Sequence, residues 1–314
     1  MSGFLERLHR GPCLLLDGGL GSELIARGLP LGTPPDRWTL ERPEEVAAVH
    51  RAYVEAGSDA IHANTFGANA ARLVRYGLSD RIVALNRTAA RLAREAAAHF
   101  VIADIGPTGE HLPPVGRGDL EEWRRHFEEQ GRILAAAEVG PQVVVAAQAA
   151  VCPQPAVDAF HVETMSDVRE ALVALEALRE VAPTLPVLVS LTFERKKRGF
   201  FTIMGDPLGP SLIRLWEAGA AAVGANCSIV SRDMLDLARE ALASTRAPIV
   251  LQPNAGSPER TPDGIRYAQD PEEFAEDLAS LLTEPRIVAL GGCCGTDPRF
   301  IAALRARVTA RRDP

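Results

Sequence analysis

Three of the five cysteines stand where short apolar runs end, and together they could bind a soft metal ion. Cys293 and Cys294 are adjacent and follow the run 287–290 and two glycines. Cys227 ends a second apolar run, 221–227. Thiolates are good ligands for zinc, and three of them leave one position of a tetrahedral ion open. The sequence therefore predicts a catalytic Zn²⁺ site made of Cys227, Cys293 and Cys294.

The cysteine count allows one alternative to metal binding at this pair. Five cysteines is an odd number and argues against a framework of disulfides. The adjacent pair could form a strained vicinal disulfide, which a reducing compartment and the third strand-end thiol disfavour. Cys13 begins an apolar run and fits a small core residue, whereas nothing around Cys152 suggests a ligand.

Eight apolar runs recur along the chain, each ended by glycine or polar residues and followed by a helix-like segment. They span 13–16, 60–63, 100–103, 159–162, 187–191, 221–227, 249–252 and 287–290. Eight strand–helix repeats in 314 residues predict an α/β fold, a single (β/α)8 TIM barrel. The alternative is a doubly wound sheet, in which the first and last strands would not meet. In a barrel the carboxyl ends of all strands share one face, so the predicted zinc site lies there.

Helical patterns lie between these runs, and one segment breaks the alternation. The predicted helices span 44–56, 69–76, 80–98, 120–139, 167–181, 208–218, 232–243, 271–282 and 298–311. Ser22 is expected to cap a short helix after the first strand. The segment 140–155 holds an apolar run between prolines and fits an extra strand, a helical excursion or an external insertion. The sequence leaves these open and otherwise predicts one domain, 1–314.

The composition restricts the class of protein. The net charge of −7 argues against general binding of nucleic acid, which requires a basic face. The first ten residues are too few and too charged for a signal peptide, and no apolar run reaches the length of a membrane span. We therefore expect a cytoplasmic protein.

Five short motifs resemble the homocysteine S-methyltransferase family, in matching order from about Leu14 to Ile301. They are Asp-Gly-Gly-Leu-Gly at 17–21, Asn-Thr-Phe-Gly-Ala-Asn at 64–69, Gly-Ala-Asn-Cys at 224–227, Pro-Asn-Ala-Gly at 253–256 and Gly-Gly-Cys-Cys-Gly-Thr at 291–296. The family includes betaine- and S-methylmethionine-dependent enzymes and the homocysteine-binding domain of cobalamin-dependent methionine synthase. Its fold is a (β/α)8 barrel, which agrees with the strand count.

The resemblance implies that the three cysteines hold zinc and that Asp17 and Glu163 receive the amino group of homocysteine. Two carboxylates at strand ends would suit an ammonium group. Each has a structural alternative, since Asp17 could bond the glycine turn and Glu163 could cap the next helix. Gly18, Thr65 and Asn226 are further expected substrate contacts, although polar residues at strand ends often only tie loops together.

The expected reaction is methyl transfer to homocysteine, forming methionine. A free thiol with a pKa near about 8.5 is mostly protonated at neutral pH, and zinc coordination removes that proton. The donor stays open between S-methylmethionine, betaine, and methylcobalamin or methyltetrahydrofolate carried by a partner chain. His62 and His161 fit core or supporting positions.

Three alternative functions fit the sequence less well than this one. A zinc hydrolase on a barrel normally uses histidines and carboxylates around an activated water, whereas the predicted site is all sulfur. A second alternative is a subunit that presents homocysteine without catalysis. The glycine-rich segment 18–21 could also form a phosphate cradle, but it lacks the full dinucleotide or P-loop pattern.

The segment 194–201 combines four consecutive basic residues with two phenylalanines in an acidic chain. It follows the fifth strand, so it is expected to rise from the catalytic face. A solvated turn is the simpler interpretation of such a charge run. The more specific hypothesis is contact with an anionic donor or with the acidic surface of a donor-carrying partner.

Overall fold

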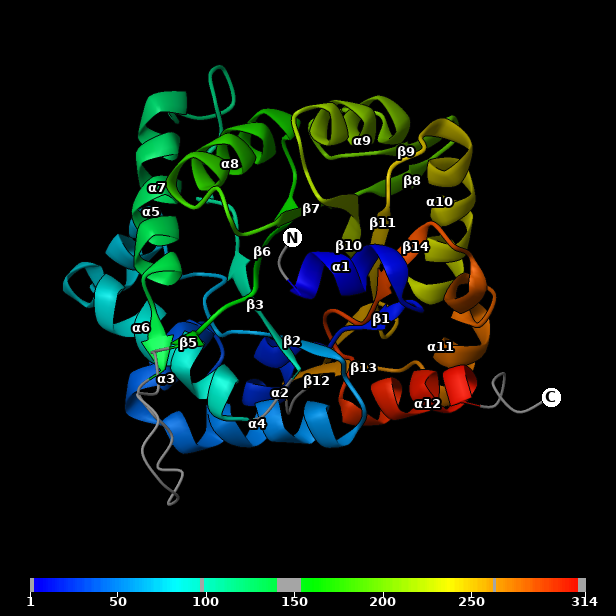
Figure 1. The fold of residues 1–314 in the computed structure, drawn as a ribbon, viewed down its shortest axis with the longest axis horizontal. Coiled ribbons are helices and arrows are strands. Elements are labelled where there is room, and N and C mark those ends of the chain that lie inside the picture. The colour runs from blue at the N-terminus through cyan, green and yellow to red at the C-terminus, as the bar shows by residue number, and fades with distance from the viewer. Residues whose placement is uncertain (1–2, 97–98, 140–153, 262–263, 310–314) are drawn as a thin grey trace.

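Eight parallel strands form one sheet that curls into a nearly closed barrel surrounded by helices (Figure 1). The computed structural model describes residues 3–96, 99–139, 154–261 and 264–309. The strands are β1 (Leu14–Leu15), β2 (Ala60–His62), β3 (Phe100–Ile105), β6 (Ala159–Met165), β7 (Val187–Leu191), β10 (Ala222–Val230), β11 (Ile249–Asn254) and β14 (Ile287–Leu290). Their order is β1-β14-β11-β10-β7-β6-β3-β2, and β1 pairs with β14. The predicted TIM barrel is confirmed, and the doubly wound alternative is wrong.

The helices cover the outside of the sheet. They are α2 (Leu20–Ala26), α3 (Trp38–Glu41), α4 (Pro43–Glu55), α5 (Ala70–Leu73), α6 (Ile82–Glu95), α7 (Leu120–Ala135), α8 (Val168–Val181), α9 (Leu208–Glu217), α10 (Ser231–Ser244), α11 (Pro271–Leu278) and α12 (Pro298–Thr309). Short 3₁₀ turns lie at Pro35–Arg37, Val74–Tyr76, Ser79–Arg81 and Leu281–Thr283. Asp270 and Asp167 accept backbone N–H groups as N-caps of α11 and α8.

The differences from the predicted elements have local causes. The predicted cap at Ser22 is wrong, because α2 begins after Gly19 and the Ser22 hydroxyl donates to the Gly19 carbonyl at 2.8 Å. The helix predicted for 120–139 ends at Ala135. Strand β4 (Glu138–Val139) follows it and pairs with β5 (Gln154–Pro155) in antiparallel fashion. The paired strands β4 and β5 thus flank residues 140–153 of the predicted insertion, and these residues lie outside the described part of the structure.

The amino-terminal helix α1 (Gly3–Arg10) lies across one end of the barrel (Figure 1). Its Phe4 and Leu8 are buried against the inward side chains of the strands, such as Leu14 and Ile102. The Phe4 ring meets the ring of Phe100, at the start of β3, edge-on with centroids 5.3 Å apart. The helix therefore closes the end of the barrel at which the strands begin, and the opposite face carries the strand ends.

The basic loop, residues 194–201, packs beside the helices of the barrel. It forms a hairpin of β8 (Glu194–Lys196) and β9 (Gly199–Phe201). Arg195 pairs with Asp233 of α10 at 3.1 Å and lies over the ring of the buried Phe200 at 5.0 Å. All eight loop residues are described, and none lines the cavity of the site presented below. The ion pair with Asp233 offsets part of the positive charge of the loop.

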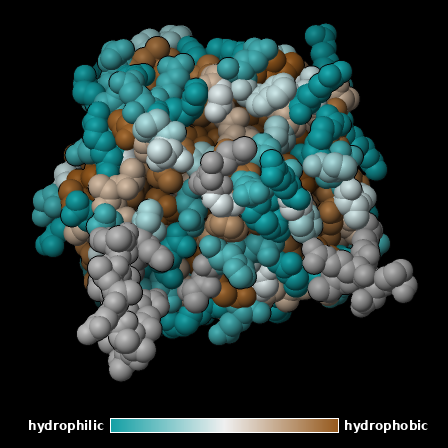
Figure 2. All heavy atoms as spheres, viewed as in Figure 1, coloured by the Kyte–Doolittle hydropathy of each residue, from teal (hydrophilic) through white to brown (hydrophobic). Residues whose placement is uncertain are grey.

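The surface drawn in Figure 2 is mostly hydrophilic, with hydrophobic residues scattered among the polar ones. Each helix in the described part of the chain is too short or too polar to cross a membrane.

Two carboxylates join the barrel where backbone pairing stops. β1 and β2, the ends of the sheet order, share no paired residues in the described structure. Instead Asp59 accepts the Leu15 N–H at 2.9 Å, and Asp17 accepts the His62 N–H at 2.9 Å. Asp59 also pairs with Arg305 at 2.7 Å. One backbone hydrogen bond crosses this seam, from the Asp59 N–H to the Leu15 carbonyl at 2.7 Å, and the side chains supply further hydrogen bonds there.

We expect Asp59→Ala to lower the free energy of unfolding by about 1–3 kcal/mol, because it leaves a backbone N–H at the seam without its acceptor. Urea unfolding measures this. Asp80→Ala is the control, since Asp80 is exposed and pairs with Arg81 at 3.3 Å. It should change stability by less than about 0.5 kcal/mol. Equal losses of unfolding free energy in the two variants would show that the carboxylate of Asp59 does not stabilise the seam.

Candidate active site

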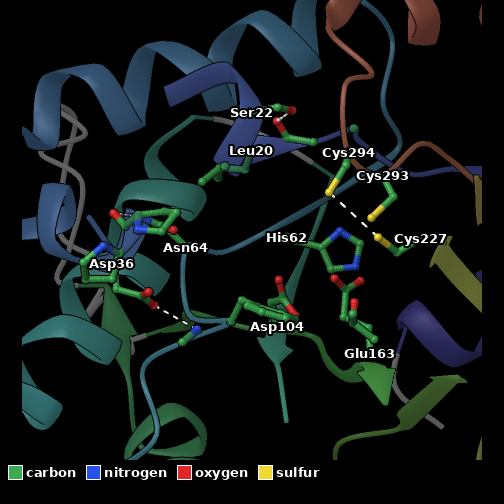
Figure 3. Close-up of a pocket in the computed structure, with 18 of the residues that line it drawn as sticks. Leu20, Ser22, Asp36, His62, Asn64, Asp104, Glu163, Cys227, Cys293 and Cys294 are labelled. Atoms are coloured by element: carbon green, nitrogen blue, oxygen red, sulfur yellow. Dashed lines mark hydrogen bonds between the residues drawn. The ribbon is translucent and has the colours of Figure 1, made fainter. Parts of the chain in front are cut away.

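Three sulfur atoms converge at the ends of two strands. Cys227 lies within β10, and Cys293 and Cys294 follow β14. Their sulfurs all lie within 4.8 Å of one another, with 3.8 Å between those of Cys227 and Cys294. Figure 3 shows the three side chains pointing toward each other on one side of the pocket. The structure thus brings the three predicted ligands together.

The backbone around the sulfurs is unusual and firmly held. Cys227 and Ser228 have φ values of 58° and 60°, in the left-handed region that non-glycine residues rarely adopt. The Cys293 N–H donates to the Pro253 carbonyl at 2.8 Å, and the Cys294 carbonyl accepts the Ala255 N–H at 3.0 Å. Strained backbone that its surroundings enforce is typical of functional sites.

The electrostatics of the cluster fit a metal ion. The Cys293 and Cys294 thiols bond the Cys227 sulfur and lower the pKa of Cys227 well below its usual range. The hydrogen bonds that the Cys293 and Cys294 thiols make to the Cys227 sulfur in turn raise the pKa values of Cys293 and Cys294. One thiolate is therefore favoured and three would repel, unless a cation lies among them. A thiophilic divalent ion satisfies this donor set.

Asn226 links the sulfur cluster to the end of β6. Its Oδ1 accepts the Thr164 N–H at 2.8 Å, and its Nδ2 donates to the Thr164 hydroxyl at 2.7 Å. These bonds hold Thr164 at a φ of 60°. The same Nδ2 lies 3.9 Å from the Cys293 sulfur. Asn226 is buried and orients a sulfur from behind, as partners of metal ligands commonly do.

Tyr267 and Gly295 close the other side of the cluster, and no sequence pattern points to Tyr267. Tyr267 ends β13 (Gly264–Tyr267), which pairs with β12 (Pro258–Thr261), and its hydroxyl bonds the Cys294 sulfur. Burial and that sulfur raise the Tyr267 pKa above its usual value. A Cβ on Gly295 would lie 2.1 Å from the Tyr267 ring, so only glycine fits beneath it.

A cavity of about 440 Å³ opens beside the sulfurs. Of the expected substrate contacts, Gly18 and Glu163 line it. A Cβ on Gly18 would lie 2.6 Å from the Thr296 hydroxyl, so the chain passes too closely there for a side chain. Asp17, Thr65 and Asn226 are fully buried and do not belong to the described wall.

The carboxylate of Asp17 is occupied by His62. Its Oδ1 lies 2.6 Å from His62 Nδ1, and its Oδ2 accepts the His62 N–H. Burial lowers the pKa of His62, but the adjacent carboxylate outweighs it and raises the pKa overall. His62 Nε2 in turn meets His161 Nδ1 at 3.0 Å, and His161 Nε2 meets the Ser190 hydroxyl at 2.8 Å. Burial and His62 lower the pKa of His161.

Two proton arrangements satisfy every member of this chain of hydrogen bonds. In one, a charged His62 donates to Asp17 and to His161, and a neutral His161 donates to Ser190. In the other, a neutral His62 donates to Asp17 and accepts from His161, and the Ser190 hydroxyl donates to His161. His62, His161 and Glu163 also lie close enough to hold a cation. The hydrogen-bonded arrangement already uses both rings and better explains the N–N distance of 3.0 Å. The sequence placed both histidines in core or supporting positions, and the structure adds that His62 reaches the cavity wall.

Glu163 lies on the cavity wall beside this chain of hydrogen bonds. Its pKa is raised to about 7 overall, chiefly by burial, while His62 lowers it and Cys227 and Asp17 contribute to raising it. β6 pairs with β3 from Ala159 to Val162, and its register with β7 shifts between Val162 and Met165, the stretch that holds Glu163. The segment 140–155 leaves Glu163 at the strand end, where the sequence predicted it.

Two further carboxylates reach the cavity, and the sequence did not select either as a site residue. Asp104 directly follows the apolar run 100–103 and lies next to last in β3, a position that could have marked it in the same way as Glu163. Asp36 lies in a 3₁₀ turn, where no strand pattern points to it. Burial raises the pKa of Asp36 to about 6. Thr65 lies behind Asp104 and bonds its backbone, so its expected role as a substrate contact finds no geometric support here.

We expect Cys294→Ser to reduce bound metal by at least about tenfold, since serine is a much poorer ligand for a soft ion. Elemental analysis of the purified variant gives the metal content. Cys13→Ala is the matched control, because Cys13 is a buried thiol in a separate hydrophobic cluster. It should keep the metal of the original protein, and full metal content in Cys294→Ser would reject the site.

Comparisons with known proteins point to one family. The family model described as homocysteine S-methyltransferase matches residues 14–308. Methionine synthase of Mycobacterium tuberculosis is 29% identical over 319 residues, which cover 95% of this chain and 25% of that protein. The Mycobacterium leprae methionine synthase is also 29% identical, over 284 residues, 87% of this chain and 22% of that protein. The chain thus spans about a quarter of the length of these curated relatives.

A solved structure shows the same fold over nearly the whole chain. The homocysteine methyltransferase MmuM from Escherichia coli, in its metallated form, aligns with a TM-score of 0.73 and 24% identity. The alignment covers 96% of this chain and 99% of that one. Because the family model matches almost all of the sequence, this chain belongs to the homocysteine S-methyltransferase family.

Proposed function

We propose that this chain transfers a methyl group to the thiol of homocysteine to form methionine, with Zn²⁺ held by Cys227, Cys293 and Cys294. One observation carries the proposal: three sulfurs within 4.8 Å open onto a cavity that also holds the carboxylate of Glu163. Sulfur and ammonium of one small amino acid could thus be held together. A bound zinc would supply deprotonation of the substrate thiol near neutral pH.

The protein groups have separate tasks in this proposal. Glu163 accepts the ammonium group, and the wall around Gly18 confines the substrate. Asn226 orients the Cys293 sulfur, and Asp17 fixes His62 on the cavity wall. Holding thiol and amino group at fixed points leaves the sulfur in a defined position for the donor methyl group. The chain acts in the cytoplasm in this proposal, where its thiols stay reduced.

The alternatives are less consistent with the site. Among described residues, no additional His, Cys, Asp or Glu joins the thiol cluster, which favours an open position over a four-ligand structural site. The cluster holds sulfur alone, unlike the histidine-rich sites of zinc hydrolases. A subunit that only presents homocysteine would share this site, and donor assays separate it from an enzyme.

The donor remains to be chosen among S-methylmethionine, betaine, and a methyl group on a corrinoid- or folate-carrying partner. Methionine formation should be assayed with S-methylmethionine, betaine, methylcobalamin and methyltetrahydrofolate in parallel. We expect at least one to give turnover that Cys294→Ser abolishes. If homocysteine binds but none of them reacts, even with the corrinoid-binding part of a methionine synthase added, the presenting subunit is the better account.

Glu163→Gln should weaken homocysteine binding by about tenfold or more while bound metal stays unchanged, because the ammonium loses a charged partner. Calorimetric titration gives the affinity, and elemental analysis gives the metal content. Glu170→Gln serves as control, since Glu170 is a buried carboxyl outside the cavity that accepts bonds from Thr108. An unaltered affinity in Glu163→Gln would assign Glu163 a structural role.

A further inference from the structure

The cavity extends beyond the sulfurs into a second half. Its inner half holds the three cysteines and Glu163, and its outer half holds Asp36 and Asn64. Figure 3 shows Asp36 and Asn64 across the pocket from the three cysteines. Drug-sized molecules occupy pockets of about 300–1,000 Å³, so a cavity of about 440 Å³ has room for more than one small amino acid. The outer half is therefore available to a second ligand.

Arg72 belongs to the outer half and is held there by its neighbours. Its backbone N–H donates to Oδ1 of Asn69, the N-cap of α5, at 3.0 Å. Its guanidinium lies over the ring of Phe66, 5.1 Å from the ring centre. Phe66 precedes Gly67, whose N–H donates to Asp36 Oδ1 at 3.0 Å. These contacts position a positive charge on the cavity wall beside Asp36.

The guanidinium of Arg72 has no anionic partner among the described residues. Its one printed side-chain interaction is with the ring of Phe66, and it is the one Lys or Arg in the described cavity wall. Arg75 differs, since it donates to the Gly109 carbonyl at 3.1 Å and pairs with Glu110 at 4.0 Å. A guanidinium binds a carboxylate through two parallel hydrogen bonds. Arg72 is therefore ready to receive the carboxylate of a ligand.

The carboxylate of homocysteine is not the anion that this position fits. In the proposed function Glu163 holds the ammonium group of homocysteine, and the carboxylate is attached to the same carbon. Burial raises the pKa of Asp36, and backbone hydrogen bonds and Arg72 lower it. Burial likewise raises the pKa of Glu163, but the cation that lowers it is His62. Arg72 thus acts on the outer half, away from the group that holds homocysteine.

We propose that Arg72 binds the carboxylate of the methyl donor, a small molecule that carries this carboxylate and a methylated sulfonium or ammonium centre. The inference rests on the proposed function and names its class of donor. The thiolate sulfur of homocysteine forms a bond to the donor methyl carbon. The bond from that carbon to the onium sulfur or nitrogen breaks, and its electron pair stays on that atom, which leaves neutral. S-methylmethionine and betaine share this chemistry.

The test measures methionine formation with S-methylmethionine and with betaine, and the donor that reacts shows whether the centre is sulfonium or ammonium. Arg72→Gln should raise the KM of that donor by about tenfold to a hundredfold, because the carboxylate loses a charged partner. The KM of homocysteine and the bound metal should stay unchanged. Arg72→Lys keeps the charge without the planar fork and should raise the donor KM less. Arg75→Gln is the matched control and should keep the original KM.

Analogues without the carboxylate give a second measurement. S-methylmethioninamide and choline carry an amide and a hydroxymethyl group where S-methylmethionine and betaine carry the carboxylate. Inhibition constants against the reacting donor should show that the matching analogue binds the original protein more weakly than the donor does. Arg72→Gln should leave the affinity of the analogue unchanged. A general disturbance of the cavity would weaken donor and analogue alike, which would overturn the role of Arg72.

The outcomes separate this inference from the proposed function. If methylcobalamin or methyltetrahydrofolate alone supports turnover, the donor class is overturned and methyl transfer to homocysteine stands. An unchanged donor KM in Arg72→Gln, or an equal rise in the KM of homocysteine, overturns the role of Arg72 alone. If homocysteine binds and no donor reacts, the donor class falls together with catalysis, and if homocysteine does not bind, the proposed function fails. Circular dichroism melting checks each fold, and Arg72→Lys carries the test if Arg72→Gln does not fold.

Discussion

Three thiols within 4.8 Å of one another cannot all ionise unless a cation lies among them, and much of the site is built around that constraint. The sulfurs come from β10 and from the turn after β14, which are separated in the sheet by β11. Curvature of the barrel brings these strand ends together, and left-handed backbone at Cys227 aims its sulfur inward. The bonds that hold this backbone therefore resist the repulsion that the thiolates would create.

The seam between β1 and β2 links the stability of the fold to the chemistry of the site. Asp17 supplies a hydrogen bond that a paired backbone would otherwise make, and it also fixes the ring of His62. One carboxylate thus serves barrel closure and the arrangement of a cavity wall. Both of its oxygens are used in this way.

The sequence predicted what depends on type and order of residues: eight strands, the face they share, and the three sulfurs at two strand ends. It could not predict which way a strand-end side chain turns. Asp17 and Asp104 both end apolar runs, yet one bonds a histidine 45 residues away and the other faces the cavity. The end of α7 was missed because the pairing of β4 with β5 overrides helix propensity.

Asn226 links the end of β6, which carries Glu163, to the sulfur site. It bonds Thr164, the neighbour of Glu163, and it approaches the sulfur of Cys293. The separation between the carboxylate of Glu163 and the sulfurs is therefore set by backbone and buried amide bonds rather than by mobile side chains. In the proposed function, a substrate that binds both Glu163 and the metal site has to match that separation. Selectivity for chain length would then follow from the rigidity of the link between β6 and the sulfur site.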